Sequence, residues 1–201
     1  MSLFKYFKPI KKIINEVVET NESINDKLEE FGIEIEINCF TDGGCFNNGK
    51  HGARAGYGVF FGDNDSRNIS EKVLCKQTNN VGELMGIKRA LEIILKEKKN
   101  NYKIKLYTDS KYCLQIFESY YNKFNKLCQP WINKWKMNNY KGIKNVEIIK
   151  KIDLLLKKFN NIKFIHIRSH QVKPNDINSE EYKIWYGNYQ ADKLANKGAN
   201  L

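Results

Sequence analysis

Apolar and polar residues alternate along residues 33–40, as expected for a β-strand that buries one face. The strand leads into Thr41-Asp42-Gly43-Gly44, so a carboxylate lies beside its end and a glycine pair allows close approach of the backbone. An ordinary turn aspartate fits the same pattern, and a role for Asp42 therefore needs support from the rest of the chain. The residues on the apolar face are Ile33, Ile35, Ile37 and Cys39.

Two further strands and a helix are predicted in the first half of the chain. Residues 57–62 form a second strand, and polar turn residues separate it from a third strand near residues 71–76. Apolar residues then recur at helical spacing from Val81 to Leu95, and Asn79-Asn80 supplies the expected N-cap. Glu83 is expected in the first helical turn, where interaction with the helix dipole is by itself enough to explain a carboxylate.

The second half of the chain alternates strands and helices. Residues 104–108 form a predicted strand, after which Asp109-Ser110 precedes a helix. Asp109 is explained either as the N-cap of that helix or as a second acid at a strand end, because Thr108-Asp109 repeats Thr41-Asp42. A helix over residues 148–159 and a strand over residues 162–167 follow.

A long polar loop and a final helix are predicted at the carboxyl-terminal end. The loop spans residues 168–187 and contains His170 and Pro174. The helix spans residues 188–198, and Asp192 lies early in it. Ala191, Leu194 and Ala195 form its apolar positions.

Residues 1–32 are predicted to be an appendage to a domain that spans residues 33–201. After Pro9 the pattern favours an amphipathic helix to about residue 27. An organelle presequence is one interpretation, but such segments usually contain arginine and this one has none. The second interpretation is a sliding-clamp-binding peptide, because the spacing of Leu3, Tyr6 and Phe7 resembles the core of that motif.

Composition narrows the class of protein. The chain has 201 residues, 41% of them hydrophobic, and a net charge of +11, which favours a polyanionic partner such as nucleic acid. Lysine, asparagine and isoleucine are abundant throughout, so part of this charge reflects general composition. Five scattered cysteines show no zinc-ligand spacing and fit reduced thiols inside a cell. No apolar run reaches the roughly 20 residues of a membrane helix, and the cytoplasm or nucleus is the expected location, with organelle targeting left open.

Residues 123–151 form the most basic region of the chain. Eight lysines share it with Glu147, and Trp131, Trp135 and Tyr140 lie between them. A solvated helix with buried tryptophans explains this pattern. A nucleic-acid surface explains it equally well, because ammonium groups neutralise phosphates and aromatic rings pack on sugars or bases.

Four acids lie beside the ends of predicted elements. Clustered carboxylates repel one another and raise one another's pKa unless cations lie between them. Mg²⁺ prefers oxygen ligands and keeps part of its water shell. The pattern therefore suggests two Mg²⁺ ions, with Mn²⁺ as an alternative, held by Asp42, Glu83, Asp109 and Asp192.

Six ordered motifs resemble ribonuclease H of type 1, and the resemblance covers residues 33–201. It implies an α/β ribonuclease H-like fold, with a five-stranded mixed sheet flanked by helices, strands 1–3 antiparallel and strands 4–5 parallel to strand 1. It also implies a monomer that cleaves the RNA strand of RNA–DNA hybrids and leaves 5′-phosphate and 3′-hydroxyl ends. The motifs are Thr41-Asp42-Gly43, Gln77-Thr78-Asn79-Asn80 with Glu83, Tyr107-Thr108-Asp109-Ser110, Trp131 with Trp135, Ser169-His170, and Gly187-Asn188 with Ala191-Asp192.

The resemblance also implies a role for each matched residue. The four acids become ligands of the metal ions, and His170 becomes a mobile residue that assists proton transfer or product release. Contacts to the hybrid minor groove, a pocket for a DNA-strand phosphate and a channel for the DNA strand are implied as well. The substrate-binding residues are Asn48, Lys76, Gln77, Thr78, Asn79, Trp131, Trp135, Asn145 and Asn188.

The chain departs from this family at two places. Lys76 stands where an arginine is common, so bidentate phosphate binding is lost there. The interval from His170 to Asp192 is longer than usual, and the insertion around residues 175–185 is expected to cover the site, alter the mobility of His170 or contact a partner. A non-catalytic hybrid-binding protein is the alternative, but all four acids are present. A polynucleotidyl transferase or integrase relative would lack the tryptophan–lysine segment.

Overall fold

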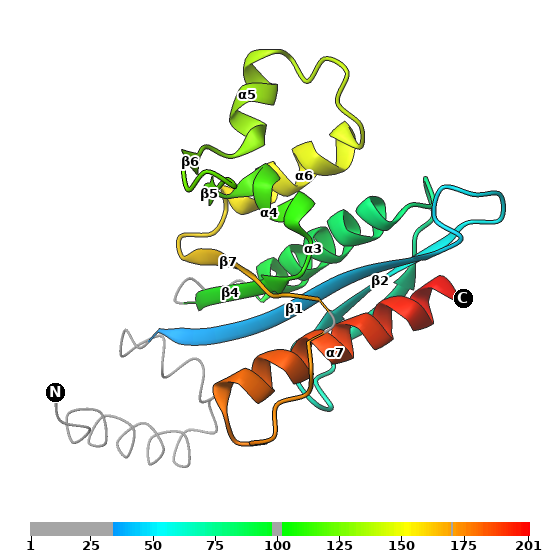
Figure 1. The fold of residues 1–201 in the computed structure, drawn as a ribbon, viewed down its shortest axis with the longest axis vertical. Helices are drawn as coiled ribbons and strands as arrows, with labels where there is room; N and C mark the ends of the chain where they lie inside the picture. The colour runs from blue at the N-terminus through cyan, green and yellow to red at the C-terminus, as the bar shows by residue number, and fades with distance from the viewer. Residues whose placement is uncertain (1–33, 98–101, 170) are drawn as a thin grey trace, which may run out of the picture.

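The structure is a computed structural model in which residues 34–97, 102–169 and 171–201 are described (Figure 1). The predicted appendage, including Leu3, Tyr6 and Phe7, lies outside these residues, and so does His170. The clamp-binding interpretation and the domain boundary therefore stay predictions. Within the three described ranges, no helix is both long and apolar enough to cross a membrane.

A mixed sheet forms the centre of the fold (Figure 1). Its strands are β1 (Ile35–Phe46), β2 (Arg54–Phe60), β3 (Ile69–Lys72), β4 (Tyr102–Thr108) and β7 (Ile162–His166). The five strands lie in the order β3-β2-β1-β4-β7. β1, β2 and β3 pair antiparallel, whereas β4 runs parallel to β1, and β7 runs parallel to β4. The predicted fold class is confirmed.

Helices cover both faces of this sheet. The helices of the described residues are α3 (Asn79–Lys96), α4 (Lys111–Phe117), α5 (Trp131–Met137), α6 (Val146–Leu156) and α7 (Glu180–Ala199). A short antiparallel hairpin, β5 (Tyr120–Tyr121) and β6 (Leu127–Cys128), follows α4. α7 crosses one face of the sheet, and α5 lies with α4 and α6 on the other side of the molecule (Figure 1).

Alternation along β1 decides which helix each residue faces. Cys39 belongs to the larger core, which also contains residues of α3, α4 and α6. Phe40, on the opposite face, stacks on Tyr107 with ring centroids 4.5 Å apart and shares a second core with Ala191 of α7. Asp42 continues the α7-facing set beyond Phe40, and the next residue, Gly43, faces α3.

Close backbone packing holds both helices against the sheet. A Cβ atom at Gly43 would overlap the backbone nitrogen of Glu83, and one at Gly58 would overlap the carbonyl oxygen of Ala191. A residue without a side chain is therefore required at each position. This packing brings α3 and α7 to the same end of β1.

The predicted start of the last helix is wrong. α7 begins at Glu180, eight residues before the predicted start at Asn188, and Ser179 is its N-cap. The hydroxyl of Ser179 accepts a hydrogen bond from the backbone nitrogen of Tyr182 at 3.0 Å. Most of the insertion near residues 175–185 therefore extends a helix, and residues 180–187 are not loop.

The predicted cap of α3 is also wrong, and of the predicted pair Asp109-Ser110 only Ser110 caps α4. Thr78, rather than Asn79-Asn80, is the N-cap of α3, and its hydroxyl accepts from Val81. Glu83 is consequently the fifth residue of α3, beyond the first turn in which it was expected. Ser110 caps α4, so capping does not explain Asp109. Strand ends differ as well, because β2 begins three residues earlier than predicted and β3 ends at Lys72.

Candidate active site

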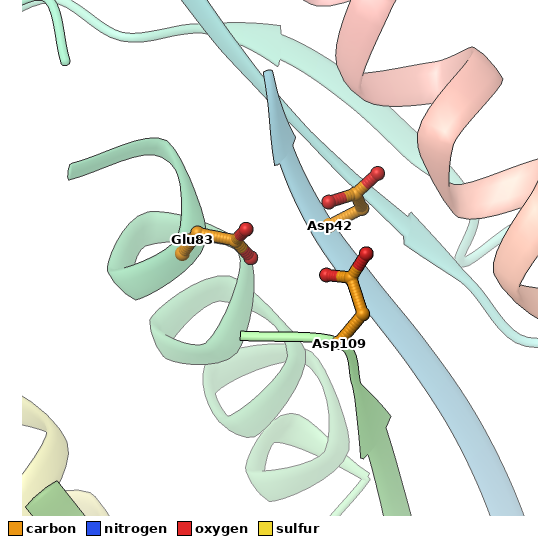
Figure 2. Close-up of side chains that lie close together, drawn as sticks. All are labelled: Asp42, Glu83 and Asp109. Carbon is orange, nitrogen blue, oxygen red and sulfur yellow. The ribbon is translucent and has the colours of Figure 1, made fainter. Parts of the chain in front are cut away.

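Three carboxylates from separate elements converge at one end of β1 (Figure 2). Asp42 belongs to β1, Glu83 to α3, and Asp109 directly follows β4. One oxygen atom from each carboxylate lies within 4.8 Å of the other two. Asp42 and Glu83 are only 7% and 5% exposed, and Asp109 is half-buried. Negative charge is thus concentrated in a site with little access to water.

Strand register explains why two of these acids meet. β1 and β4 run parallel, and Thr41 pairs with Thr108. The next residue of each chain segment is the acid, so both carboxylates leave the sheet at the same edge. The repeated Thr-Asp pattern in the sequence therefore corresponds to neighbouring positions in space.

The buried carboxylate of Glu83 has one oxygen atom without a protein partner. Its Oε1 accepts a weak hydrogen bond from Nδ2 of Asn79 at 3.4 Å, but its Oε2 has no hydrogen-bond partner in the described part of the chain. Leaving a buried polar atom unpaired is unfavourable. Hard divalent cations prefer carboxylate oxygens, so the three acids fit an ion such as Mg²⁺.

The pKa values of the clustered acids are raised, as expected for buried carboxylates with no cation between them. Burial, followed by the charges of Asp109 and Asp192, raises the pKa of Asp42 to about 8. Burial, followed by Asp42 and Asp109, raises the pKa of Glu83 well above its ordinary value. A cation between the carboxylates favours their ionised forms. Metal binding is therefore expected to release protons.

We expect the metal-free protein to lose stability as the pH rises from about 4 to about 8. The folded state keeps protons on Asp42 and Glu83 that the unfolded state releases near pH 4, so the stabilisation is complete below that pH and is lost as the pH approaches 8. Mg²⁺ at about 100 times its Kd adds about 2.7 kcal/mol, which raises Tm by about 5–10 °C.

Thermal unfolding with Mg²⁺ or EDTA, at pH 5 and at pH 8, measures this coupling. The Mg²⁺-dependent rise in Tm is expected to be larger at pH 8, because protons compete with the metal at pH 5. Solutions matched in ionic strength with NaCl provide the control. Equal rises at the two pH values would contradict the linkage.

Asp192 lies beside the three-carboxylate group without joining it. It lines the same cavity as Asp42 and Asp109, and its charge contributes to the raised pKa of Asp42. Asn196, one helical turn further along α7, donates from Nδ2 to Oδ1 of Asp192 at 3.0 Å. The structure thus brings three of the four predicted ligands within reach of one cation and places the fourth next to them.

The residues assigned to the minor groove lie around the start of α3. Oδ1 of Asn48 accepts from the backbone nitrogen of Asn79 at 3.2 Å, and Asn79 also reaches Glu83. Gln77 has a structural role here, because its Oε1 accepts from the backbone nitrogen of Ala55 at 2.6 Å. Asn48 and Asn79 are therefore placed next to the acids, and Gln77 ties the preceding loop to β2.

The residues assigned to a DNA-strand phosphate lie at two helix starts. Thr78 caps α3, and Asn145 precedes α6. Val81 and Ile148, three residues further along each helix, pack in one hydrophobic cluster, so the two helix starts are neighbours. Helix N-termini attract phosphates through their free amide groups. Lys76 is exposed just before α3.

Trp131 and Trp135 are packed together rather than fully exposed. Their ring centroids lie 5.8 Å apart, and Nε1 of Trp131 donates to the hydroxyl of Tyr120 at 2.8 Å. Both rings are partly buried against the larger core. Lys136 pairs with Asp153 at 2.6 Å. The exposed lysines of this region are Lys123, Lys126, Lys134, Lys141, Lys144, Lys150 and Lys151.

A cavity beside the acids also contains residues that were not assigned from the sequence. Asn188, which was predicted to bind substrate, lines it, and Trp185 and Tyr189 line it as well. Tyr189 was missed because nothing in the sequence shows which residues of the predicted helix face the acids, and Trp185 was missed because the first part of α7 was predicted to be loop. Ser179 followed by two glutamates is a helix-start signal that would have identified it. His170 lies outside the described residues, although its chain neighbours Ser169 and Gln171 line the cavity.

The fold and the acid cluster define a nuclease domain, and comparison with known proteins identifies its family. Residues 34–200 match RNase H. The chain therefore belongs to the RNase H family and is a ribonuclease H by enzyme class.

Individual relatives agree with this assignment. Ribonuclease H of Clostridium botulinum is 32% identical over 163 residues, which cover 79% of this chain and 91% of the relative. Ribonuclease H of Schizosaccharomyces pombe is 34% identical, over 80% of this chain and 52% of the relative. The solution structure of the PFV RNase H domain has a TM-score of 0.55 at 22% identity and covers 83% of this chain and 96% of that domain, a likeness of fold.

Proposed function

We propose that the chain is an endonuclease that hydrolyses the RNA strand of RNA–DNA hybrids with two divalent cations, leaving 5′-phosphate and 3′-hydroxyl ends. The observation that carries this proposal is the convergence of Asp42, Glu83 and Asp109, with a buried oxygen of Glu83 left unpaired. Hydrolysis joins the oxygen of water to phosphorus and breaks the bond to the 3′-oxygen, which takes up a proton. Membership of the RNase H family supports the hybrid as substrate.

The four acids hold the cations in this proposal. Asp42, Glu83 and Asp109 supply the three clustered oxygens, and Asp192 contributes from α7. Mg²⁺ is the expected ion, and Mn²⁺ suits the same ligands. When bound, the ions lower the pKa of the attacking water and stabilise the leaving oxygen. His170 is proposed to carry protons near neutral pH, as its motif implies.

Substrate recognition is assigned to two surfaces around the acids. Asn48 and Asn79 are proposed to contact the minor groove, where RNA presents 2′-hydroxyls, and the hydrogen bond between them supports a shared role. The helix starts at Thr78 and Asn145 are proposed to bind a DNA-strand phosphate, which their proximity supports. The tryptophans of α5 and the surrounding lysines continue that surface toward the DNA strand. Contacts to both strands would make the enzyme selective for a hybrid.

We expect the full chain to cut the labelled RNA strand of a hybrid when Mg²⁺ is present and to leave it intact in EDTA. Double-stranded RNA and double-stranded DNA of the same sequence are the matched controls and should stay uncut. Gel analysis of the products reports the end groups. Binding without metal-dependent cutting would favour the non-catalytic alternative and overturn the proposed function.

A further inference from the structure

The first half of α7 carries a column of aromatic rings beside the acids. The rings of Trp185 and Tyr189 are parallel within 9°, with centroids 5.3 Å apart. Tyr182 lies 5.6 Å from Trp185 at the other end of the column. We call Tyr182, Trp185 and Tyr189 the aromatic ledge. Its Tyr189 end is 44% exposed.

The hydrophobic core does not account for the ledge. On the same helix, Ile184 and Tyr186 pack into the core beneath α7, where Tyr186 meets Phe60 edge-on at 6.1 Å. Trp185 and Tyr189 belong to none of the core clusters formed by the described residues. They instead line the cavity that contains Asp42, Asp109 and Asp192. Their position points to a ligand near the reacting phosphate.

Positive charge accompanies the rings. Nζ of Lys173 lies 5.7 Å from the ring centre of Tyr182 and 5.9 Å from that of Trp185, and Lys193 lies 5.5 Å from that of Tyr189. Arg168 lines the same cavity. Flat rings with lysine ammonium groups over them suit nucleic acid, because the cations neutralise phosphates and the rings stack on bases. The indole nitrogen of Trp185 donates to the carbonyl of Gln171 at 3.1 Å and fixes the ring.

Helix α7, which carries the ledge, and helix α5, which carries Trp131 and Trp135, lie on opposite sides of β1 (Figure 1). The surface around α5 is assigned to the DNA strand, so the strand that passes the acids toward α7 is the RNA. Bases inside a duplex are stacked on their own neighbours and do not present free faces. A ring column of this kind therefore suits a nucleotide that has left the duplex.

We propose that the aromatic ledge binds unpaired nucleotides of the RNA strand where that strand leaves the hybrid. The inference rests on the proposed function, because it takes the strand at the acids to be RNA. It also assigns a function to the lengthened interval before Asp192, since the extra residues build the first turns of α7 and carry Tyr182 and Trp185 of the ledge. The enzyme would then prefer hybrids next to single-stranded RNA.

The test compares a blunt hybrid with the same hybrid extended by about six unpaired RNA nucleotides, at the 5′ end or the 3′ end. Binding is measured by fluorescence anisotropy in EDTA, and cleavage is measured separately in Mg²⁺. We expect one extension to tighten binding by about tenfold in the parent chain. Trp185→Ala with Tyr189→Ala should abolish that gain and leave binding of the blunt hybrid within about twofold.

Three controls make the outcome decisive. Lys183→Ala changes an exposed residue of α7 away from the ledge and should keep the gain. Trp185→Phe with Tyr189→Phe retains two rings and should restore most of it. If the double alanine variant does not fold, Tyr189→Ala alone, at a part-exposed site, should still reduce the gain.

The results separate this inference from the proposed function. The proposed role of the ledge would be overturned if neither extension tightened binding in the parent chain. It would also be overturned if the variants lost binding to blunt and extended hybrids equally. A gain that depends on the ledge, without metal-dependent cleavage, would overturn the proposed function and leave the ledge as a binding site.

Discussion

Replacing Asp109 with asparagine is expected to abolish cleavage and to spare hybrid binding. Asparagine has nearly the same shape as aspartate but lacks the charge that cation binding needs. Asp109 is the half-buried member of the three-carboxylate group, and its charge acts on both Asp42 and Glu83. Loss of a group that stabilises developing charge in an active site lowers kcat by about 100- to 1,000-fold, and loss of metal lowers it further.

Cleavage rate and hybrid affinity should therefore respond differently to Asp109→Asn. We expect kcat to fall by at least about a thousandfold and the Kd of the hybrid in EDTA to change by less than about threefold, because the basic and aromatic surfaces are intact. Asp63→Asn removes the same charge at an exposed position outside the cluster and serves as the control. Normal cutting by Asp109→Asn would show that the ligand assignment is wrong.

The sheet and the pair of strand-end acids were predictable because both depend on local patterns. Alternation identified the first strand, and the repeated Thr-Asp pattern marked two strand ends. Parallel pairing of Thr41 with Thr108 turns that repeat into spatial proximity. The family resemblance then supplied the relative directions of the strands. Where the local pattern and the family motif agree, the sequence alone was sufficient to predict the strand and its acid.

The features that were missed depend on contacts that leave no periodic pattern of apolar residues in the sequence. The β5–β6 hairpin has two residues in each strand, too few for alternation to appear. The start of α7 was hidden by the polar run around Pro174, although Ser179 and the following glutamates carry a capping signal. Tyr182 and Trp185 were missed with it, and Tyr189 was missed because only the structure shows that it lines the same cavity as Asp192. These features required the three-dimensional structure.

The position of Glu83 depends on Gly43, a residue with no side chain that could take part in the reaction. Gly43 faces α3, and a Cβ atom there would overlap the backbone nitrogen of Glu83 and the backbone carbon of Gly82. Backbone atoms of a helix cannot turn aside as a side chain can. A larger residue at position 43 must therefore push α3 away from β1 and separate Glu83 from Asp42.

Gly43→Ala is thus expected to destabilise the metal-free protein by about 3 kcal/mol and to lower cleavage by at least about a hundredfold. Gly44→Ala is the matched control, because its nearest contact is the side-chain Oδ1 of Asn196 at 3.2 Å. That side chain can shift, so the expected destabilisation is less than about 1 kcal/mol. Urea unfolding of both variants in EDTA measures the difference without a contribution from bound metal. Equal stability of the two variants would mean that α3 does not need glycine at position 43 to deliver Glu83 to the site.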